Sequence, residues 1–268
     1  MTGPTVSRLF VYPIKSLGGI QLDAAEVEAR GSRHDRRWML VDETGDFLSQ
    51  RRYPRMALAR VRVEGDRLVV NAPDMPPLKL ALSPEPGAAV RACIFGDEVE
   101  AVSCGVEADR WFARFLGAAC RLVYMPDETE RAVDPEYAGV GDRVGFADGF
   151  PLLLFSEASL DDLNARLENP LPVNRFRPNI LVAGCAPYEE DRWRTVRVGG
   201  VGLRVVKPCA RCAITTVDQS SGEKGKEPLR TLASYRKVGG EVYFGQNAIP
   251  DATSLVRVGD AVEVISSS

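Results

Sequence analysis

The strongest constraint on the fold is a repeated pattern of short stretches in which apolar and polar residues alternate on both sides of a turn. The pattern occurs at residues 60–70, 194–206 and 255–265, each with glycine at its turn. Alternation around such a turn is typical of a β-hairpin. Many short strands of this kind favour a barrel or a sandwich.

Helix-like patterns are few, and their apolar faces predict core packing. They cover residues 108–116, 159–167 and 227–235. Ser159 would cap the second helix, and Pro228 would take the first helical position of the third. We therefore expect a mainly β protein with some α structure (α+β). A polar stretch from Asp127 to Asp142 follows the first β-rich part and predicts a domain boundary near residue 130.

The composition argues against several classes of protein. The chain has 268 residues and a formal net charge of −3, so we expect no nucleic-acid-binding surface. No apolar run reaches the roughly 18 residues of a membrane span, and Met1–Thr5 lacks the features of a secretion signal. Six cysteines in a chain of this length do not predict a disulfide scaffold, so a cytoplasmic location is expected.

The segment most indicative of chemistry is Lys207–Thr216, which holds Cys209 and Cys212 with Arg211 between them. Basic neighbours favour the thiolate, which is the form that binds metals and acts as a nucleophile. Half a zinc site, a redox dithiol and an inert buried pair remain alternatives. A zinc site needs four ligands, but His34 is the single histidine and the other cysteines are scattered. A thioredoxin-type pair opens a helix, whereas β-branched residues after this pair favour a strand.

Three further basic clusters stand where strands are predicted to begin or end. Lys15–Ser16 follows an apolar run, Arg36 precedes a strand, and Arg177–Asn179 leads into another. Lysine, hydroxyl groups and forked guanidinium groups hold anions through short charge-assisted hydrogen bonds. For any one cluster alone, ordinary surface ion pairing is the simpler interpretation, and Arg51–Arg52 is assigned to that class.

A set of motifs runs in one order along nearly the whole chain, from about residue 7 to 265. The motifs are Tyr12–Ser16, Asp35–Trp38, Ser156–Leu160, Asn174–Asn179, Cys209–Cys212, Thr215–Asp218, Lys226–Leu229, Ser234–Arg236 and Phe244–Gln246. Together they resemble the MOSC-domain molybdenum proteins with an N-terminal β-barrel. That family includes the mitochondrial amidoxime-reducing component and bacterial hydroxylaminopurine-detoxifying reductases. A single tripeptide would mean little, but the collinear set is specific.

The resemblance implies two domains with a cofactor between them. Residues 1–130 would form an antiparallel MOSC N-terminal β-barrel domain, and residues 131–268 a MOSC domain of β-barrel and mixed α/β structure. The implied cofactor is molybdenum–molybdopterin rather than pyridoxal phosphate, with the metal held by a pterin dithiolene and one protein thiolate. The residues that map to its anchors are Lys15, Ser16, Arg36, Arg177, Asn179 and Arg211.

Two residues map to catalytic positions in the family. The second cysteine of the pair is the metal ligand there, so the resemblance assigns this role to Cys212 and makes Cys209 a neighbour. A soft thiolate suits a metal that is already held by sulfur. Asp148 matches an acidic position near the metal and is a candidate proton donor, although a turn aspartate before glycine is an equal explanation. Gly149–Phe150 departs from the hydroxyl residues of the mitochondrial members, which leaves the substrate range open.

The resemblance implies an oxidoreductase that reduces N-hydroxylated or N-oxygenated compounds, such as hydroxylamines, amidoximes and hydroxylaminopurines, to amines or amidines. This is a detoxifying reaction. The chain shows neither the membrane anchor of the mitochondrial members nor the iron–sulfur domain of some bacterial ones. We therefore expect a separate flavin or iron–sulfur protein to supply electrons. The alternative is a non-enzymatic sulfur or molybdopterin carrier that uses Cys212.

Overall fold

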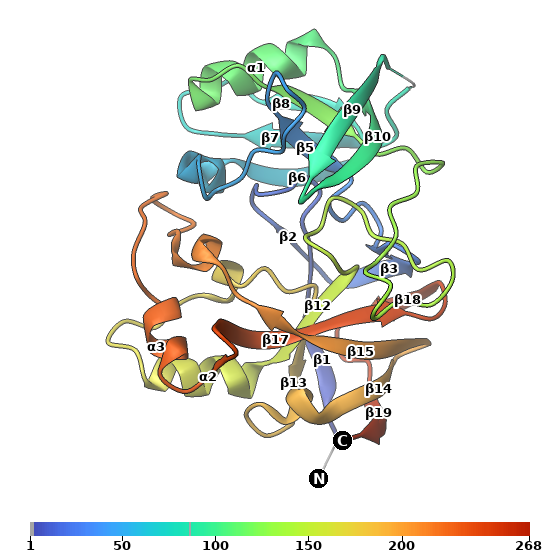
Figure 1. The fold of residues 1–268 in the computed structure, drawn as a ribbon, viewed down its shortest axis with the longest axis vertical. Helices are drawn as coiled ribbons and strands as arrows, with labels where there is room; N and C mark the ends of the chain where they lie inside the picture. The colour runs from blue at the N-terminus through green and yellow to red at the C-terminus, as the bar shows by residue number, and fades with distance from the viewer. Residues whose placement is uncertain (1–2, 86) are drawn as a thin grey trace.

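Alternating sequences in the first half of the chain form two small antiparallel sheets, which make the upper lobe in Figure 1. The computed structural model describes residues 3–85 and 87–268. The four-stranded sheet has the order β5-β11-β10-β9, with β5 (Trp38–Val41), β9 (Ala89–Ile94), β10 (Asp97–Ser103) and β11 (Arg121–Tyr124). The three-stranded sheet consists of β6 (Arg60–Glu64), β7 (Arg67–Asn71) and β8 (Leu78–Ala81).

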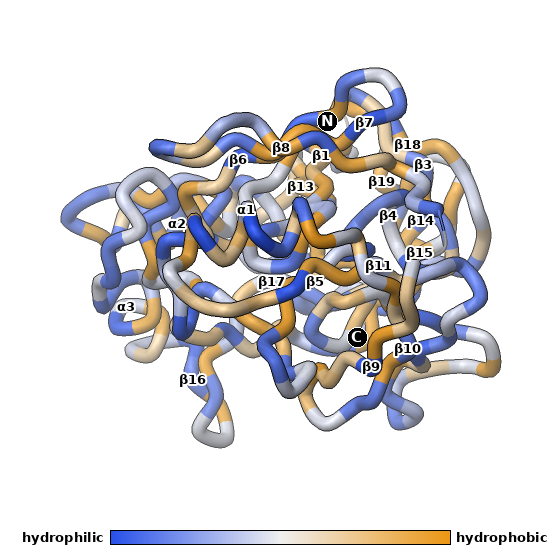
Figure 2. The backbone as a smooth tube through the Cα atoms, turned by 90° about the horizontal axis from the view of Figure 1, so that it is seen from above, coloured by the Kyte–Doolittle hydropathy of each residue, from blue (hydrophilic) through white to orange (hydrophobic). Residues whose placement is uncertain are grey.

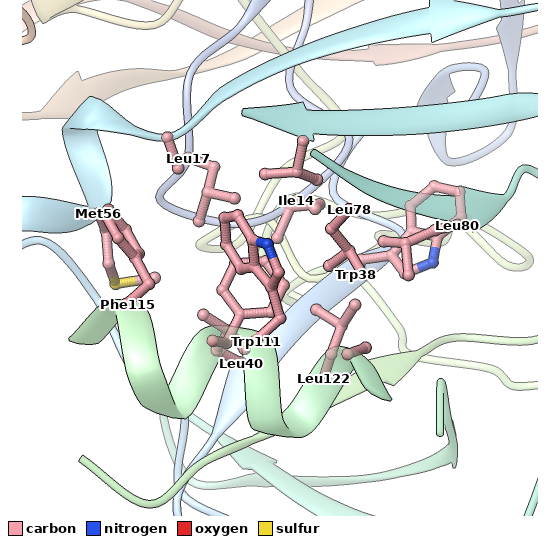
Figure 3. Close-up of a cluster of buried hydrophobic side chains, with 14 of the residues drawn as sticks. Ile14, Leu17, Trp38, Leu40, Met56, Leu78, Leu80, Trp111, Phe115 and Leu122 are labelled. Atoms are coloured by element: carbon pink, nitrogen blue, oxygen red, sulfur yellow. The ribbon is translucent and has the colours of Figure 1, made fainter. Parts of the chain in front are cut away.

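The core of the upper lobe lies between these sheets and helix α1 (Val106–Leu116). Figure 3 shows Trp111 and Phe115 of α1 among the apolar side chains that the strands contribute. Gly117 ends the helix in the left-handed region with a φ of 68°, a conformation that glycine adopts without a Cβ clash. A short 3-10 helix, η1 (Pro54–Leu58), buries Met56 in the same core.

The lower lobe is built on a nine-stranded sheet with the order β19-β14-β15-β17-β12-β13-β1-β2, and β16 pairs with β17. Its strands are β1 (Thr5–Val11), β2 (Ile20–Leu22), β12 (Leu152–Ser156), β13 (Ile180–Ala183), β14 (Trp193–Val198), β15 (Val201–Ala210), β16 (Lys237–Val238), β17 (Glu241–Pro250) and β19 (Val262–Ser267). A three-stranded sheet has the order β18-β3-β4, with β3 (Ala24–Glu28), β4 (Gly31–Ser32) and β18 (Ser254–Arg257). Only β12 and β13 pair in parallel among the ladders of the described chain.

The nine-stranded sheet curls back on itself, because Thr5 forms a bridge with Ala261 just before β19. The N-terminal strand β1 therefore completes the lobe that the C-terminal half builds. Two helices, α2 (Glu157–Ala165) and α3 (Leu229–Ala233), cover one side of the lower lobe (Figure 1). The remaining 3-10 helices are η2 (Val173–Arg175), η3 (Glu189–Arg192) and η4 (Ala213–Thr216).

Hydrophobic residues are concentrated in several strands, as expected for strands that are buried on at least one face. In Figure 2, the orange colour that marks hydrophobic residues appears along β1, β5 and β13. Every residue of β5 is buried. Among the helices of the described residues, none has the length and apolarity needed to cross a bilayer.

The predicted fold class, mainly β with some α, is confirmed. The hairpins at residues 60–70 and 194–206 are present as β6–β7 and β14–β15. Helix α2 begins at Glu157, two residues earlier than predicted, because Ser156 is the cap and accepts a hydrogen bond from the Ser159 amide.

Two predictions of strand structure were wrong, and Pro228 is the N-cap of α3 instead of its first helical residue. Residues 255–265 do not form a hairpin, because β18 pairs with β3 and β19 pairs with β14. Between them, β1 takes the available backbone groups: Gly259 N donates to Val6 O, and Val6 N donates to Asp260 O. The β-branched residues after Cys212 form the 3-10 helix η4 instead of a strand. Hydroxyl groups stabilise this turn, since Thr215 Oγ1 donates to Cys212 O at 2.9 Å.

Candidate functional site

All eight residues predicted from the sequence as site residues line one cleft of the structure. The cleft encloses about 770 Å³ of empty space, including its open mouth. The residues are Lys15, Ser16, Arg36, Asp148, Arg177, Asn179, Arg211 and Cys212. They come from loops at strand ends: after β1, before β5, before β12, before β13 and after β15. Segments separated by more than 190 residues in the sequence therefore meet at this site.

The cleft is strongly basic. Its lining holds five cationic side chains (Lys15, Arg36, Arg175, Arg177 and Arg211) and one anionic side chain, Asp148. The protein as a whole has a formal net charge of −3. A local concentration of positive charge in a protein of opposite net charge favours an anionic group in this place.

Several buried guanidinium nitrogens in the lining have no hydrogen-bond partner within the protein. They are Arg175 Nε and Nη1, Arg177 Nη2 and Arg211 Nε. Leaving a buried charged donor unpaired is costly, so these nitrogens favour a ligand rich in acceptor atoms. The donor set thus fits a phosphorylated, acceptor-rich pterin, and the thiol of Cys212 in the same lining fits a metal bound by sulfur.

The backbone is strained at three of the predicted anchors. Ser16, Arg36 and Arg177 have φ values of 67°, 46° and 56°, in the left-handed region that residues with a Cβ rarely adopt. Such outliers cost on the order of 1–3 kcal/mol each and are concentrated at ligand clamps and active sites. The strain is therefore consistent with a site whose side-chain positions are set for binding.

Two of these arginines lie over the ring of Tyr12. The guanidinium carbons of Arg36 and Arg177 lie 4.4 Å and 4.2 Å from the centroid of its ring. Burial raises the pKa of Tyr12 to about 12, so the ring carries a neutral hydroxyl at physiological pH. Burial and the nearby charge of Arg36 lower the pKa of Arg177 to about 10. Two cations held this close favour an anion between or beside them.

Asn179 lines the cleft, but its side chain serves the protein itself. Its Oδ1 accepts hydrogen bonds from Leu153 N at 3.1 Å and Arg36 Nη1 at 3.3 Å, and its Nδ2 donates to Phe10 O. The side chain is almost completely buried. Its contacts therefore fix the Arg36 guanidinium and the start of β12.

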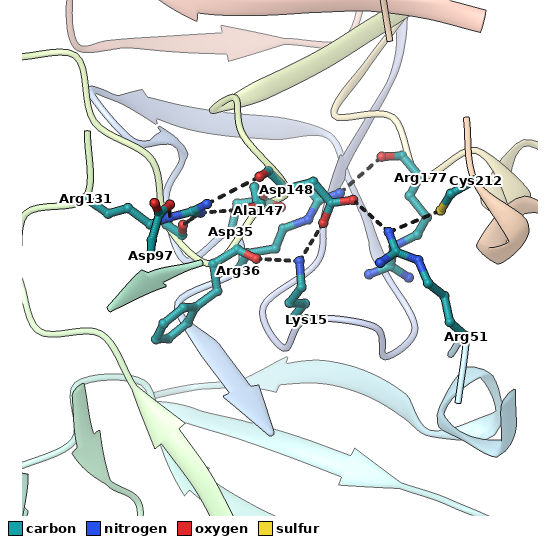
Figure 4. Close-up of polar contacts among 12 residues, drawn as sticks. Lys15, Asp35, Arg36, Arg51, Asp97, Arg131, Ala147, Asp148, Arg177 and Cys212 are labelled. Carbon is teal, nitrogen blue, oxygen red and sulfur yellow. Dashed lines mark hydrogen bonds and ion pairs between the residues drawn. The ribbon is translucent and has the colours of Figure 1, made fainter. Parts of the chain in front are cut away.

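Lys15 and Asp148 form an ion pair at the mouth of the cleft. Lys15 Nζ lies 2.6 Å from Asp148 Oδ1 and also donates to Phe146 O at 2.8 Å (Figure 4). Lys15 is buried, whereas 63% of the Asp148 side chain is exposed. Burial in the cleft acts to raise the pKa of Asp148, but Lys15 and Arg51 outweigh it and lower the pKa to about 2. Asp148 is therefore a carboxylate near neutral pH, which does not suit a resting proton donor.

The two cysteines have different environments. Cys212 directly precedes η4, and Arg51 Nη2 lies 3.5 Å from its sulfur and 3.8 Å from Asp148 Oδ2 (Figure 4). Cys209 instead receives a contact from Arg211 Nη1 at 3.1 Å. Within residues 3–85 and 87–268, no group of three or more His, Cys, Asp or Glu side chains is arranged to hold a metal ion.

Sequence reasoning missed two residues of this site. Arg51 was assigned to ordinary surface ion pairing, but it contacts both Cys212 and Asp148. Arg175 lies in the motif Asn174–Asn179 but is not among the predicted anchors, whereas in the structure it is 7% exposed and lines the cleft. Its position in that motif was the available signal. For Arg51 no local signal exists, because its partners lie about 100 and 160 residues away in the chain.

Both halves of the sequence match known domain families. The MOSC N-terminal beta barrel domain matches residues 3–119, and the MOSC domain matches residues 141–263. The chain is 37% identical to mitochondrial amidoxime-reducing component 1 of Mus musculus, with 97% of this chain and 82% of that protein aligned. It is 39% identical to mitochondrial amidoxime reducing component 2 of Bos taurus, with 87% of this chain and 72% of that protein aligned. The chain belongs to the family of MOSC proteins with a MOSC N-terminal β-barrel domain, together with the mitochondrial amidoxime-reducing components.

Proposed function

We propose that this protein is a molybdenum-dependent oxidoreductase that reduces N-hydroxylated compounds, such as amidoximes and hydroxylamines, to amidines and amines. The observation that carries the proposal is the cleft itself, where buried guanidinium nitrogens without a partner line the same space as the thiol of Cys212, which lies next to Arg51. The identity to two amidoxime-reducing components over most of the chain supports the same reaction.

A molybdenum–molybdopterin cofactor would supply two-electron chemistry and a place for the substrate oxygen. Arg175, Arg177 and Arg211 would donate hydrogen bonds to its anionic and polar edges, and Arg36 would add charge from a position fixed by Asn179. Cys212 would be its protein ligand. Arg51 Nη2 would place a positive charge beside the ligating sulfur, since it already lies 3.5 Å away.

The reaction balances with two electrons and two protons for each substrate molecule. The N–O bond of the amidoxime breaks; one proton joins the hydroxyl group, which leaves as water, and the second proton joins the nitrogen to give the amidine. Lys15 and Asp148, 2.6 Å apart at the mouth of the cleft, would hold a proton near the departing oxygen. Because Asp148 is ionised, the proton would come from the lysine or from solvent.

The electron source and the cellular setting are further parts of this proposal. We infer that a separate flavin or iron–sulfur protein donates the electrons, because the sequence carries no dinucleotide fingerprint and no four-cysteine cluster motif. A cytoplasmic location and a role in detoxifying N-hydroxylated bases remain predictions from the sequence.

The proposal is tested with protein purified from a molybdenum-replete host. With reduced methyl viologen as electron donor, it should convert benzamidoxime to benzamidine, and turnover should scale with molybdenum content. A carrier of sulfur or molybdopterin would bind the cofactor but would give no turnover. Molybdenum-loaded protein that fails to reduce benzamidoxime or any other N-hydroxylated compound offered would refute the proposed activity.

A further inference from the structure

The hairpin that joins β9 and β10 carries an unusual residue at its tip. Ile94 pairs with Asp97, so the turn consists of Phe95 and Gly96, with φ values of 51° and 93°. A two-residue turn with positive φ at both positions favours Asn-Gly, Asp-Gly or Gly-Gly. Phenylalanine is strained there, and 46% of it remains exposed. Neither turn geometry nor core packing explains an aromatic residue at this position.

The Phe95 ring lies beside the groups that surround the candidate reaction site. Its centroid is 4.7 Å from that of the Phe47 ring, and the two rings are tilted by 51° to each other. Lys15 Nζ lies 5.2 Å from the same centroid, and the Arg51 guanidinium carbon lies 5.4 Å from it. These two cations are the ones that contact Asp148, and Arg51 also contacts Cys212.

Phe95 faces a second, wider hollow that continues the basic cleft. The lining of this outer hollow includes Phe95, and it shares Asp148, Gly149, Phe150 and Cys209 with the basic cleft. Phe150 belongs to the other lobe, and its ring makes an edge contact with Tyr137 at 5.8 Å. A molecule that approaches Cys212 through this hollow thus passes an exposed aromatic ring on the hairpin tip.

We propose that Phe95 is a specificity-determining residue, whose exposed ring stacks on the flat ring of aromatic N-hydroxylated substrates while their N–O group enters the basic cleft. This inference rests on the proposed function and adds to it a preference for planar aromatic over small aliphatic substrates. Aromatic rings favour offset or edge contacts of this kind. The strain at Phe95 is retained because the ring serves the substrate rather than the hairpin.

The test compares benzamidoxime with acetamidoxime, which share the reacting group and differ in the ring. The variants are Phe95→Asn, which suits the turn but removes the ring, and Phe95→Tyr, which keeps an aromatic ring. With viologen as donor, Phe95→Asn should raise the KM for benzamidoxime about tenfold, leave its kcat within about twofold, and leave acetamidoxime nearly unchanged. Phe95→Tyr should behave as the wild type.

A stability measurement separates this role from a structural one. Phe95→Asn should melt at the same or a higher temperature than the wild type, because Asn tolerates the positive φ. Calorimetric binding of benzamidine and acetamidine to the molybdenum-loaded protein gives a readout without turnover, and Phe95→Asn should abolish the preference for benzamidine. Equal effects on both amidoximes, or an unchanged preference for benzamidine, would overturn the inference. Absence of turnover in the wild type would refute the proposed function, and the binding measurement would still decide the role of Phe95.

Discussion

Arg36 and Arg177 illustrate how single residues define this site. Both residues have positive φ values, and both guanidinium groups lie over the Tyr12 ring. Backbone carbonyls fix both side chains, since Arg36 Nη2 donates to Arg177 O and Arg177 Nη1 donates to Leu17 O. A long side chain that is already ordered loses little entropy when it binds a ligand. The arginines are therefore prepared for an anion before it arrives.

The first prediction concerns these two arginines. Arg36→Ala and Arg177→Ala should each lower molybdenum and pterin occupancy when the cofactor is limiting. The loss of one charge-assisted partner costs about 1.5–3 kcal/mol, which is about one to two decades in affinity. Metal and pterin analysis of the purified variants measures the effect, with exposed Arg110→Ala as the control. Full occupancy in the double variant would show that the arginines are surface charges.

A second prediction concerns Asp148 and pH. A carboxyl group whose pKa is lowered to about 2 is ionised throughout the range from about pH 5 to 8. Its titration should therefore leave no limb in the pH profile of kcat over this range. The profile of Asp148→Asn should be lower in amplitude and should fall on its alkaline side, because burial lowers the pKa of Lys15 and the variant removes the counter-charge that opposes this shift. A limb that is present in the wild type and missing from Asp148→Asn would establish Asp148 as the proton donor.

At the scale of elements, one buried amide pair joins the two lobes at the site. Gln219 Nε2 donates to Gln50 Oε1 at 2.9 Å, and Gln50 Nε2 donates to Ser16 O at 2.7 Å. Both glutamines are buried. The pair holds the loop that carries Arg51 against the segment that follows η4, so the position of Arg51 beside Cys212 depends on it.

The third prediction follows from that pair. Gln219→Ala leaves the buried Gln50 Oε1 without its hydrogen-bond donor, which should lower the free energy of unfolding by about 1–3 kcal/mol. Urea denaturation measures the loss. Glu223→Ala, an exposed change in the same loop, is the matched control and should remain within about 0.5 kcal/mol of the wild type. Equal stability of the two variants would contradict the role given to the Gln50–Gln219 pair.

The sequence predicted elements where the pattern was local and failed where a distant strand decided the outcome. The alternation at β6–β7 and β14–β15 was sufficient to predict both hairpins, because strands joined by a tight turn pair with each other. The same alternation at residues 255–265 did not predict the pairing, because β18 pairs with β3, β19 pairs with β14, and β1 bonds the segment that joins them. In the site, charged residues at strand ends could be found by their chemistry. Arg51 could not, because its role depends on the docking of the lobes.

At the scale of the whole molecule, the cleft lies where loops of both lobes meet. Lys15, Arg36 and Arg51 come from the first part of the chain, whereas Asp148 and Cys212 come from the second. The N-terminal strand β1 is built into the C-terminal lobe next to β13. This connection fixes Lys15 and Ser16, which follow β1, relative to Arg177 and Asn179, which precede β13.

The fourth prediction concerns electron supply to the whole protein. The sequence contains no G-x-G-x-x-G after a strand and no four-cysteine cluster motif, and the proposal is that a separate protein supplies the electrons. Purified protein with NADH or NADPH alone should leave benzamidoxime unreduced. Reduced viologen, or a suitable flavin or iron–sulfur protein, should restore turnover. Nicotinamide-driven turnover by rigorously pure protein would demand a cofactor site in the chain itself.

The most direct test of the central claim is X-ray absorption at the molybdenum edge, recorded for the wild type, Cys212→Ser and Cys209→Ser. If Cys212 ligates the metal and Cys209 is a neighbour held by Arg211, Cys212→Ser should show one sulfur neighbour fewer and no benzamidoxime turnover. Cys209→Ser should match the wild type in sulfur coordination and retain substantial turnover. Unchanged sulfur coordination in Cys212→Ser, or the same loss in both variants, would contradict the account.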